Sequence, residues 1–189
     1  LKALRVPRKD IFSQNAEKEG SQPIQYEQLK LLQGEIFSFA STILSGDVSK
    51  EESELVNQFL HAARMALHSA KSIKDEIRNF DDFETSENTF LRSENKTFRN
   101  RLIRLYNKVV IVLSSEDQED IKAALEDMLA LLNKDDKVFL KATTKATAEG
   151  RIKDLDISTA LLVNRVFNQS SRQLIYGLKD ILLADSEPE

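Results

Sequence analysis

Residues 156–183 read DISTALLVNRVFNQSSRQLIYGLKDILL, and this stretch decides the fold. It carries two adjacent lines of apolar, small or amide side chains, since residues three and four positions apart share a helix face. One line is Ile157, Leu161, Asn164, Asn168, Ser171, Ile175, Leu178 and Leu182, and the other is Ala160, Val163, Phe167, Ser170, Leu174, Gly177 and Ile181. A helix with two such lines touches more than one neighbour. We therefore predict a central helix over about residues 154–184.

Two amide side chains, Asn164 and Asn168, lie on a core-facing line of this helix. Buried amides need hydrogen-bond partners. Such a pair either fixes the register between packed helices or forms part of a ligand site. The sequence favours the first interpretation and leaves the second open.

Four further segments show helical periodicity of apolar residues. They cover about residues 23–45, 49–80 and 86–114, and the stretch from the acidic turn at 114–120 to Gly150. Pro23 suits a first helical position. The chain has only five Gly and three Pro, and the prolines lie near its ends, which favours long helices over many short strands.

The apolar lines of these segments predict the faces that meet in the core. They are Leu29, Leu32, Ile36, Phe39 and Ile43; Val56, Phe59, Ala63, Ala66 or Leu67, Ala70, Ile73, Ile77 and Phe80; Leu91, Asn95, Phe98, Leu102, Leu105, Val109 and Val112; and Ile121, Leu125, Met128, Leu132, Phe139, Ala142 and Ala146. In the first segment the spacing alternates between three and four residues, which is typical of a seam between two packed helices.

Local signals set the expected boundaries. Ser49 and Glu52 have the spacing of a capping box, which opens a helix. We expect a polar break at 81–86 (DDFETS) and a kink near 133–136, where Asp135 interrupts the apolar line. The predicted fold is an all-α, elongated, antiparallel up-down bundle of about five long helices, with a sixth only if part of residues 10–20 is helical.

Composition narrows the classes of function. Of 189 residues, 27 are Lys or Arg and 31 are Asp or Glu, which gives a net charge of −4. That balance argues against a nucleic-acid partner, which requires a basic face. The absence of Cys excludes thiol catalysis and thiolate metal sites. Enzyme motifs such as a Gly-rich phosphate loop or HExxH are also missing, so we expect no catalytic residues and no cofactor.

Residues 61–80 read HAARMALHSAKSIKDEIRNF and carry a polar stripe. Steps of three and four residues place its members on one helix face: His61, Arg64, His68, Lys71, Asp75 and Arg78. Polar side chains beside an apolar line usually flank a helix interface and stay partly hydrated. If the stripe has a function, we expect it to contact a partner or an anion.

Three more specific interpretations of this stretch compete with that one. A metal site is disfavoured because His61 and His68 lie about 10 Å apart along the helix axis. The sequence HSAKS at 68–72 is similar to the His-x-x-Lys-Gly pattern of histidine phosphotransfer bundles, with Ser72 in place of Gly. An anion-binding surface would use Arg64, Lys71, Lys74 and Arg78, although nearby acids favour a solvated, salt-bridged face.

Two segments resemble the PhoU-like C-terminal domain of bacterial sodium/phosphate cotransporter-family proteins. The first is ARMALHSAKSIKDEIRNF (63–80), with an alanine-rich run followed by a Lys-Asp and a basic-Asn pair. The second is residues 156–183, which resembles the last helix of those domains through its Asn-Arg, Asn-x-Ser and Leu-Lys-Asp pairs. Together the segments cover about a quarter of the chain.

The resemblance implies a regulatory domain at the cytoplasmic face of the bacterial inner membrane, coupling phosphate status or partner binding to transport. Its partners would be the transport helices of the same chain, a second copy, phosphate or a regulatory protein. The start LKALRVPRKDIF would be a basic juxtamembrane segment, as the positive-inside rule expects. The domain division is then 1–22 juxtamembrane segment and linker, 23–184 PhoU-like bundle, and 185–189 disordered tail.

The chain also departs from PhoU itself. PhoU proteins carry a repeated acidic Glu/Asp-x-x-x-Asp motif that binds metal, and here Glu116 to Asp120 is the one match. We therefore expect no metal site. A free-standing metal-binding regulator of phosphate signalling, a phosphotransfer bundle using His68, and a plain scaffold or dimerisation bundle remain as alternatives.

Overall fold

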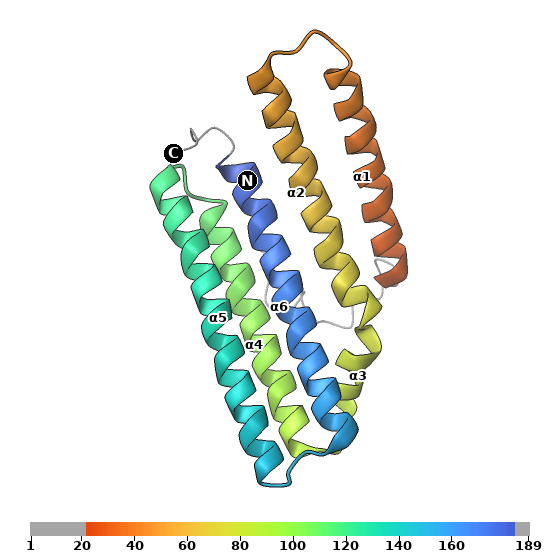
Figure 1. Cartoon of the computed structure of the whole chain (residues 1–189), viewed down its shortest axis with the longest axis vertical. Helices are drawn as coiled ribbons and strands as arrows, with labels where there is room; N and C mark the ends of the chain where they lie inside the picture. Colours follow the sequence, from red (N-terminus) through yellow and green to blue (C-terminus); the bar gives the residue numbers. More distant parts are fainter. Residues whose placement is uncertain (1–21, 184–189) are drawn as a thin grey trace.

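The computed structural model describes residues 22–183 as six α-helices, and within that range it contains no strand. The helices are α1 (Gln22–Leu44), α2 (Lys50–Asp75), α3 (Ile77–Thr85), α4 (Thr89–Val112), α5 (Gln118–Ala148) and α6 (Asp154–Leu182). They pack as an antiparallel bundle that is much longer than it is wide (Figure 1). The all-α prediction is confirmed. The predictions for 1–21 and 185–189 fall outside the described residues.

Helix α6 is central, as the two lines of the opening stretch predicted. It packs along α2 on one side and α5 on the other, and it also contacts α3 and α4 (Figure 1). Its buried residues come from both lines and include Asn164 and Asn168 from one and Val163 and Phe167 from the other. Leu161 and Ile181, one from each line, remain 42% and 49% exposed.

A phenylalanine cluster joins helices α3, α4, α5 and α6. The Phe98 ring of α4 lies 5.3 Å from Phe139 of α5 and 5.2 Å from Phe167 of α6, measured between ring centroids. Phe83 of α3 lies 6.0 Å from Phe98 and is only 1% exposed. Aromatic pairs in these tilted arrangements add to the burial of their area, so this cluster fixes how four helices meet.

The helix count differs from the prediction because the segment at 49–80 is divided. Ser49 and Glu52 do form the predicted capping box, with Glu52 N donating to Ser49 Oγ at 3.1 Å. Helix α2 nevertheless ends at Asp75, and α3 begins at Ile77. The predicted polar break at 81–86 is wrong, since α3 runs to Thr85. The bend at Glu76 allows Phe83 to enter the core against α4.

Helix α5 runs from Gln118 to Ala148 without interruption and is straight where Asp135 suggested a kink (Figure 1). The Asp135 side chain is accommodated because it faces two arginines of α4, as described below. The apolar residues on either side of it, Leu132 and Phe139, are both buried. One polar residue on the core-facing line is therefore paired and does not bend the helix.

The seam predicted for the first helix does not face the core. Leu29, Leu32, Ile36 and Phe39 of α1 are 42%, 52%, 37% and 70% exposed. Helix α1 instead turns Ala40 toward α2 and packs chiefly on that helix. Likewise, the α2 residue buried at the α6 contact is Ala62, not a member of the predicted apolar line. The two predicted lines therefore border an open face of the molecule.

Candidate functional site

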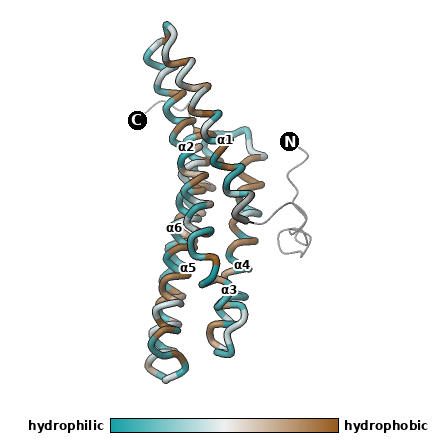
Figure 2. The backbone as a smooth tube through the Cα atoms, turned by 90° about the vertical axis from the view of Figure 1, so that its right-hand side faces the viewer, coloured by the Kyte–Doolittle hydropathy of each residue, from teal (hydrophilic) through white to brown (hydrophobic). Residues whose placement is uncertain are grey.

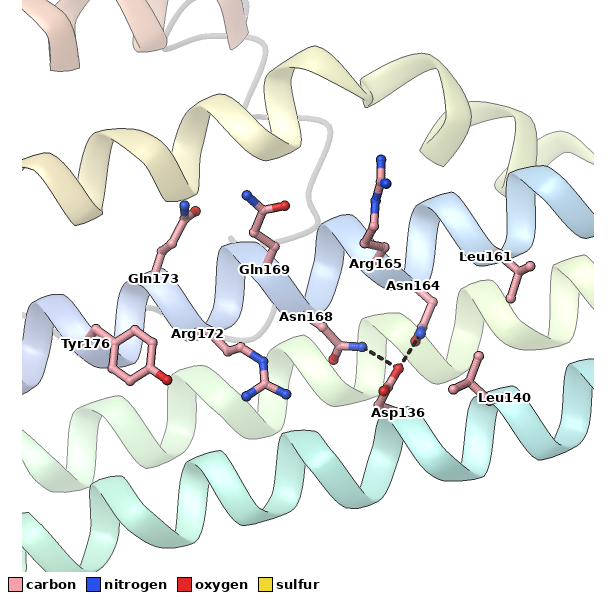
Figure 3. A pocket seen from close by; sticks show the side chains of 10 residues that line it. All are labelled: Asp136, Leu140, Leu161, Asn164, Arg165, Asn168, Gln169, Arg172, Gln173 and Tyr176. Carbon is pink, nitrogen blue, oxygen red and sulfur yellow. Dashed lines mark hydrogen bonds between the residues drawn. The ribbon is translucent and has the colours of Figure 1, made fainter.

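A cleft of about 540 Å³ lies on the outer side of α5 and α6 (Figure 3). Helix α5 contributes Asp136 and Leu140, and α6 contributes the remaining lining: Leu161, Asn164, Arg165, Asn168, Gln169, Arg172, Gln173 and Tyr176. The cleft thus contains both asparagines that the sequence singled out, with one carboxylate and two guanidinium groups.

Asp136 is the centre of a hydrogen-bonded cluster in this cleft. Its Oδ1 accepts the Nδ2 of Asn164 at 2.6 Å and the Nδ2 of Asn168 at 2.8 Å (Figure 3). The two amides lie one helical turn apart on α6, so both reach the same oxygen on α5. They are 3% and 7% exposed. The cluster therefore joins two helices by charge-assisted hydrogen bonds inside the bundle.

The amide oxygens of the same cluster are not satisfied. Asn164 Oδ1 and Asn168 Oδ1 are buried and have no hydrogen-bond partner among the described residues. An unpaired buried acceptor is costly. The pair suits a water molecule or a ligand group that carries N–H or O–H donors.

The rim of the cleft is basic. Arg172 Nη2 donates to Asn133 Oδ1 of α5 at 2.5 Å, which holds that guanidinium beside α5. Arg165, Gln169 and Gln173 point away from Asp136 (Figure 3). The cleft therefore offers hydrogen-bonding groups and positive charge at its surface, and the carboxylate of Asp136 inside. These groups suit the binding of a molecule.

Asp135, the neighbour of Asp136, faces α4 instead of α6. It forms an ion pair with Arg104 and lies 3.9 Å from Arg101 Nε. The Arg101 side chain is 5% exposed, lies 5.1 Å from the Phe98 ring, and donates from Nη2 to the Asp135 carbonyl at 3.0 Å. Consecutive aspartates thus tie α5 to α4 on one side and to α6 on the other.

Burial shifts the pKa of two groups in the network around Asp135 and Arg101. It lowers the pKa of the Arg101 guanidinium from its usual value, and the charge of Asp135 opposes that shift. Burial also raises the pKa of the nearby Glu94 carboxyl, and the charge of Arg101 opposes that shift. Arg101 Nη1 has no hydrogen-bond partner in the described part of the chain. Each group is therefore held in its charged form less firmly than in water.

The six residues of the polar stripe are all exposed, but they do not meet at one point. His61 Nδ1 lies 2.6 Å from Asp180 Oδ2 of α6. The Arg64 guanidinium lies 5.7 Å from the Phe37 ring of α1. His68 and Lys71 lie along the exposed side of α2, Asp75 ends that helix, and Arg78 lies on α3 beyond the bend. The stripe is thus anchored to α6 at one end.

The basic surface proposed from the same stretch is also divided. Lys74 lies with its Nζ 4.5 Å from the Tyr26 ring of α1, and Arg64 likewise turns to α1. Lys71 and Arg78 remain exposed. Within residues 22–183, no group of three or more His, Asp or Glu side chains lies close enough to hold a metal ion.

Small residues allow α2 and α6 to approach closely along the segments that carry the resemblance. Ser69 Oγ lies 2.9 Å from Ser170 Oγ, and Ser170 Oγ donates to the Ser69 carbonyl at 3.1 Å. A Cβ on Gly177 would lie 3.3 Å from the Ala62 carbonyl oxygen. The two segments therefore form one continuous antiparallel interface.

Sequence reasoning identified the asparagines but missed their acceptor and the buried arginine. Asp136 was part of a charged run, NKDDK at 133–137, that is typical of a solvated helix face. The available signal was that this run interrupts the apolar line of α5 between Leu132 and Phe139. An acid in such a position must find a donor on a neighbouring helix.

Among residues 22–183, no helix is both long enough and apolar enough to cross a membrane. No protein-family model, curated protein or solved structure matches the sequence.

Proposed function

We propose that this chain is a non-catalytic regulatory domain of a membrane protein similar to sodium/phosphate symporters. The observation that carries the proposal is the pairing of α2 with α6. The two segments that resemble the PhoU-like domain, 63–80 and 156–183, lie far apart in sequence, and they pack against each other through Ser69, Ser170 and Gly177. Because the two segments form the same helix interface, the residues of each restrict which residues fit in the other.

The regulatory surface would be the polar stripe. His68, Lys71 and Asp75 lie on the exposed side of α2, Arg78 lies exposed on α3, and His61 is held by Asp180 of α6. A partner that binds there would contact α2 directly and α6 through that pair. The partner would be the transport helices of the same chain, a regulatory protein or phosphate, and transport itself would take place outside residues 22–183.

The first test is to read the coding sequence upstream of Leu1. Several apolar spans of about 20 residues each would support the proposal, since a membrane-spanning helix requires that length. A start codon close upstream, with no such span, would overturn it.

The second test uses the full-length protein in cells and measures sodium-dependent uptake of labelled phosphate. We expect the double variant Lys71→Glu/Arg78→Glu to change how uptake responds to external phosphate, because two exposed charges of the stripe are reversed. The matched control is Lys122→Glu/Lys141→Glu, which reverses two exposed lysines of α5. Equal responses for wild type, variant and control would remove the stripe from the regulatory surface.

A further inference from the structure

The paired helices α1 and α2 carry an apolar face that no described part of the chain covers. We call it the hairpin face and define it by Leu29, Leu32, Ile36 and Phe39 of α1 and Phe59, Ala66, Ala70 and Ile73 of α2. Its larger members are well exposed, with Phe39 at 70%, Leu32 at 52% and Phe59 at 43%. Figure 2 shows apolar positions along both helices.

The lower part of the hairpin face opens into a groove of about 630 Å³. Leu29 of α1 lies on one side of this groove, Leu102 and Tyr106 of α4 lie on the other, and Ala66 and Leu174 belong to the α2 and α6 parts of its lining. The charged residues of its lining are two cations, Lys74 and Arg99, and two acids, Asp81 and Glu84. The groove is therefore apolar with a balanced rim, which suits an apolar helix of low net charge.

Contacts with α2 determine which side of α1 is left exposed. Ala40 is 5% exposed, and the Phe37 and Tyr26 rings lie under Arg64 and Lys74 of α2. Since these residues hold α1 on α2, the helix cannot turn its apolar seam inward without losing them. The seam also has the alternating three- and four-residue spacing of a helix that packs against another helix.

We propose that a second copy of this chain covers the hairpin face, with α1 of each copy lying on α1 and α2 of the other. The two hairpins would form a four-helix arrangement around a two-fold axis, and each α1 would fill the groove of its partner. An interface of this kind uses the same patch on both copies. The proposal is independent of the regulatory function proposed above.

Charge and area both favour a second copy as the occupant. The α1 positions that flank the seam are Gln28, Gln33, Glu35, Ala40 and Thr42, with one charge among them, so two copies would not repel each other. The 23 residues of α1 extend about 35 Å. With helices about 10 Å apart, a two-helix face covers about 700 Å² per copy. That value is close to the roughly 800 Å² per partner of a stable interface.

The test is the molar mass of the purified chain, measured by sedimentation equilibrium and by light scattering after size exclusion. The monomer has a mass of 21.5 kDa, so a dimer should give 2 × 21.5 = 43 kDa. We expect a concentration-dependent rise toward that value between about 1 and 100 µM protein. A mass of 21.5 kDa over the whole range would overturn the proposal, whether the face is covered by residues outside 22–183 or by a different protein.

Charge substitutions on the hairpin face locate the interface. Leu32→Glu and Phe39→Glu should each raise the dimer dissociation constant by roughly 100-fold, because each places two charges in the apolar interface. Leu31→Glu is the matched control. It lies on the same helix and is 70% exposed, but it points about a quarter turn or more away from the seam, so it should leave the constant unchanged.

Circular dichroism must show that both variants retain the helix content of the parent chain, and their exposure makes that the expected result. The chain has no Cys, so a single Gln28→Cys substitution, at an exposed position that flanks the seam, also gives a unique labelling site. Spin labels there should report a partner label within a few nanometres only at dimer concentrations. If Leu32→Glu and Phe39→Glu dimerise as well as the parent chain, the dimer contact lies outside the hairpin face and the proposal is wrong.

Discussion

Asp136 joins α5 to α6 through its side-chain carboxylate. One carboxylate oxygen accepts two amide N–H groups from two residues that are almost fully buried. Inside a protein, hydrogen bonds to a charged acceptor are stronger than neutral ones, and losing the acceptor leaves its donors unsatisfied. The cluster therefore selects one register between the two helices, because a shift of a single residue would separate the amides from the carboxylate.

Replacing Asp136 with Ala should lower the free energy of unfolding by about 2–4 kcal/mol, because both amide nitrogens lose their acceptor. Urea denaturation followed by circular dichroism measures this change. Asp127→Ala is the control, since Asp127 is exposed on the same helix and has the same gain in helix propensity. Equal free energies for the two variants would show that the cluster contributes nothing to stability.

At the scale of the helices, sequence pattern located the elements better than it located their neighbours. The capping box at Ser49 marked the start of α2 because both of its partners are local in sequence. The end of α2 was missed because no Gly or Pro marks it. The bend at Glu76 is favoured by the burial of Phe83 against Phe98, and such a tertiary contact leaves no local signal.

The close approach of α2 and α6 depends on Gly177 and predicts an asymmetry between two helical glycines. Gly34→Ala in α1 should raise the free energy of unfolding by about 0.5–1 kcal/mol, since no atom lies within 4 Å of the added Cβ. Gly177→Val should lower it by about 1–3 kcal/mol, because the added atoms meet the Ala62 carbonyl. Both changes are measured by urea denaturation.

The comparison of the two glycines requires a third variant, so that the same substitution is made at both positions. Gly177→Ala removes the same backbone freedom as Gly34→Ala, but its Cβ would lie 3.3 Å from backbone. We expect it to gain less stability than Gly34→Ala. An equal gain would mean that the two helices can separate at no cost, and it would contradict the close packing at this position.

For the whole molecule, the sequence predicted the fold class and the central position of α6, because both follow from the apolar pattern of long segments. It did not predict that the α1 seam faces outward, since periodicity shows which side of a helix is apolar but not what lies beside it. For the candidate site, Asn164 and Asn168 were identified from their position on a core-facing line. Asp136 was missed because its partners are 28 and 32 residues away.

Amide hydrogen exchange should divide the molecule into a labile and a protected part. Among residues 25–44 of α1 only Ala40 is buried, whereas α6 has eleven buried residues. Since protection follows burial and packing, α1 amides should exchange at least about 100-fold faster than α6 amides in dilute protein. Mass spectrometry of peptic fragments measures this. Uniform protection at low concentration would mean that α1 is held as firmly as the core.

The contact between α2 and α6 also sets the order of events during synthesis. Ser69 and its partner Ser170 are separated by 101 positions, so α2 leaves the ribosome long before the helix against which it packs. At about 5–20 residues per second, that interval is roughly 5–20 s. Throughout that time the apolar sides of α1 and α2 are exposed on the nascent chain, because α6 has not yet been synthesised. Premature termination before residue 154 would consequently yield a fragment that depends on chaperones.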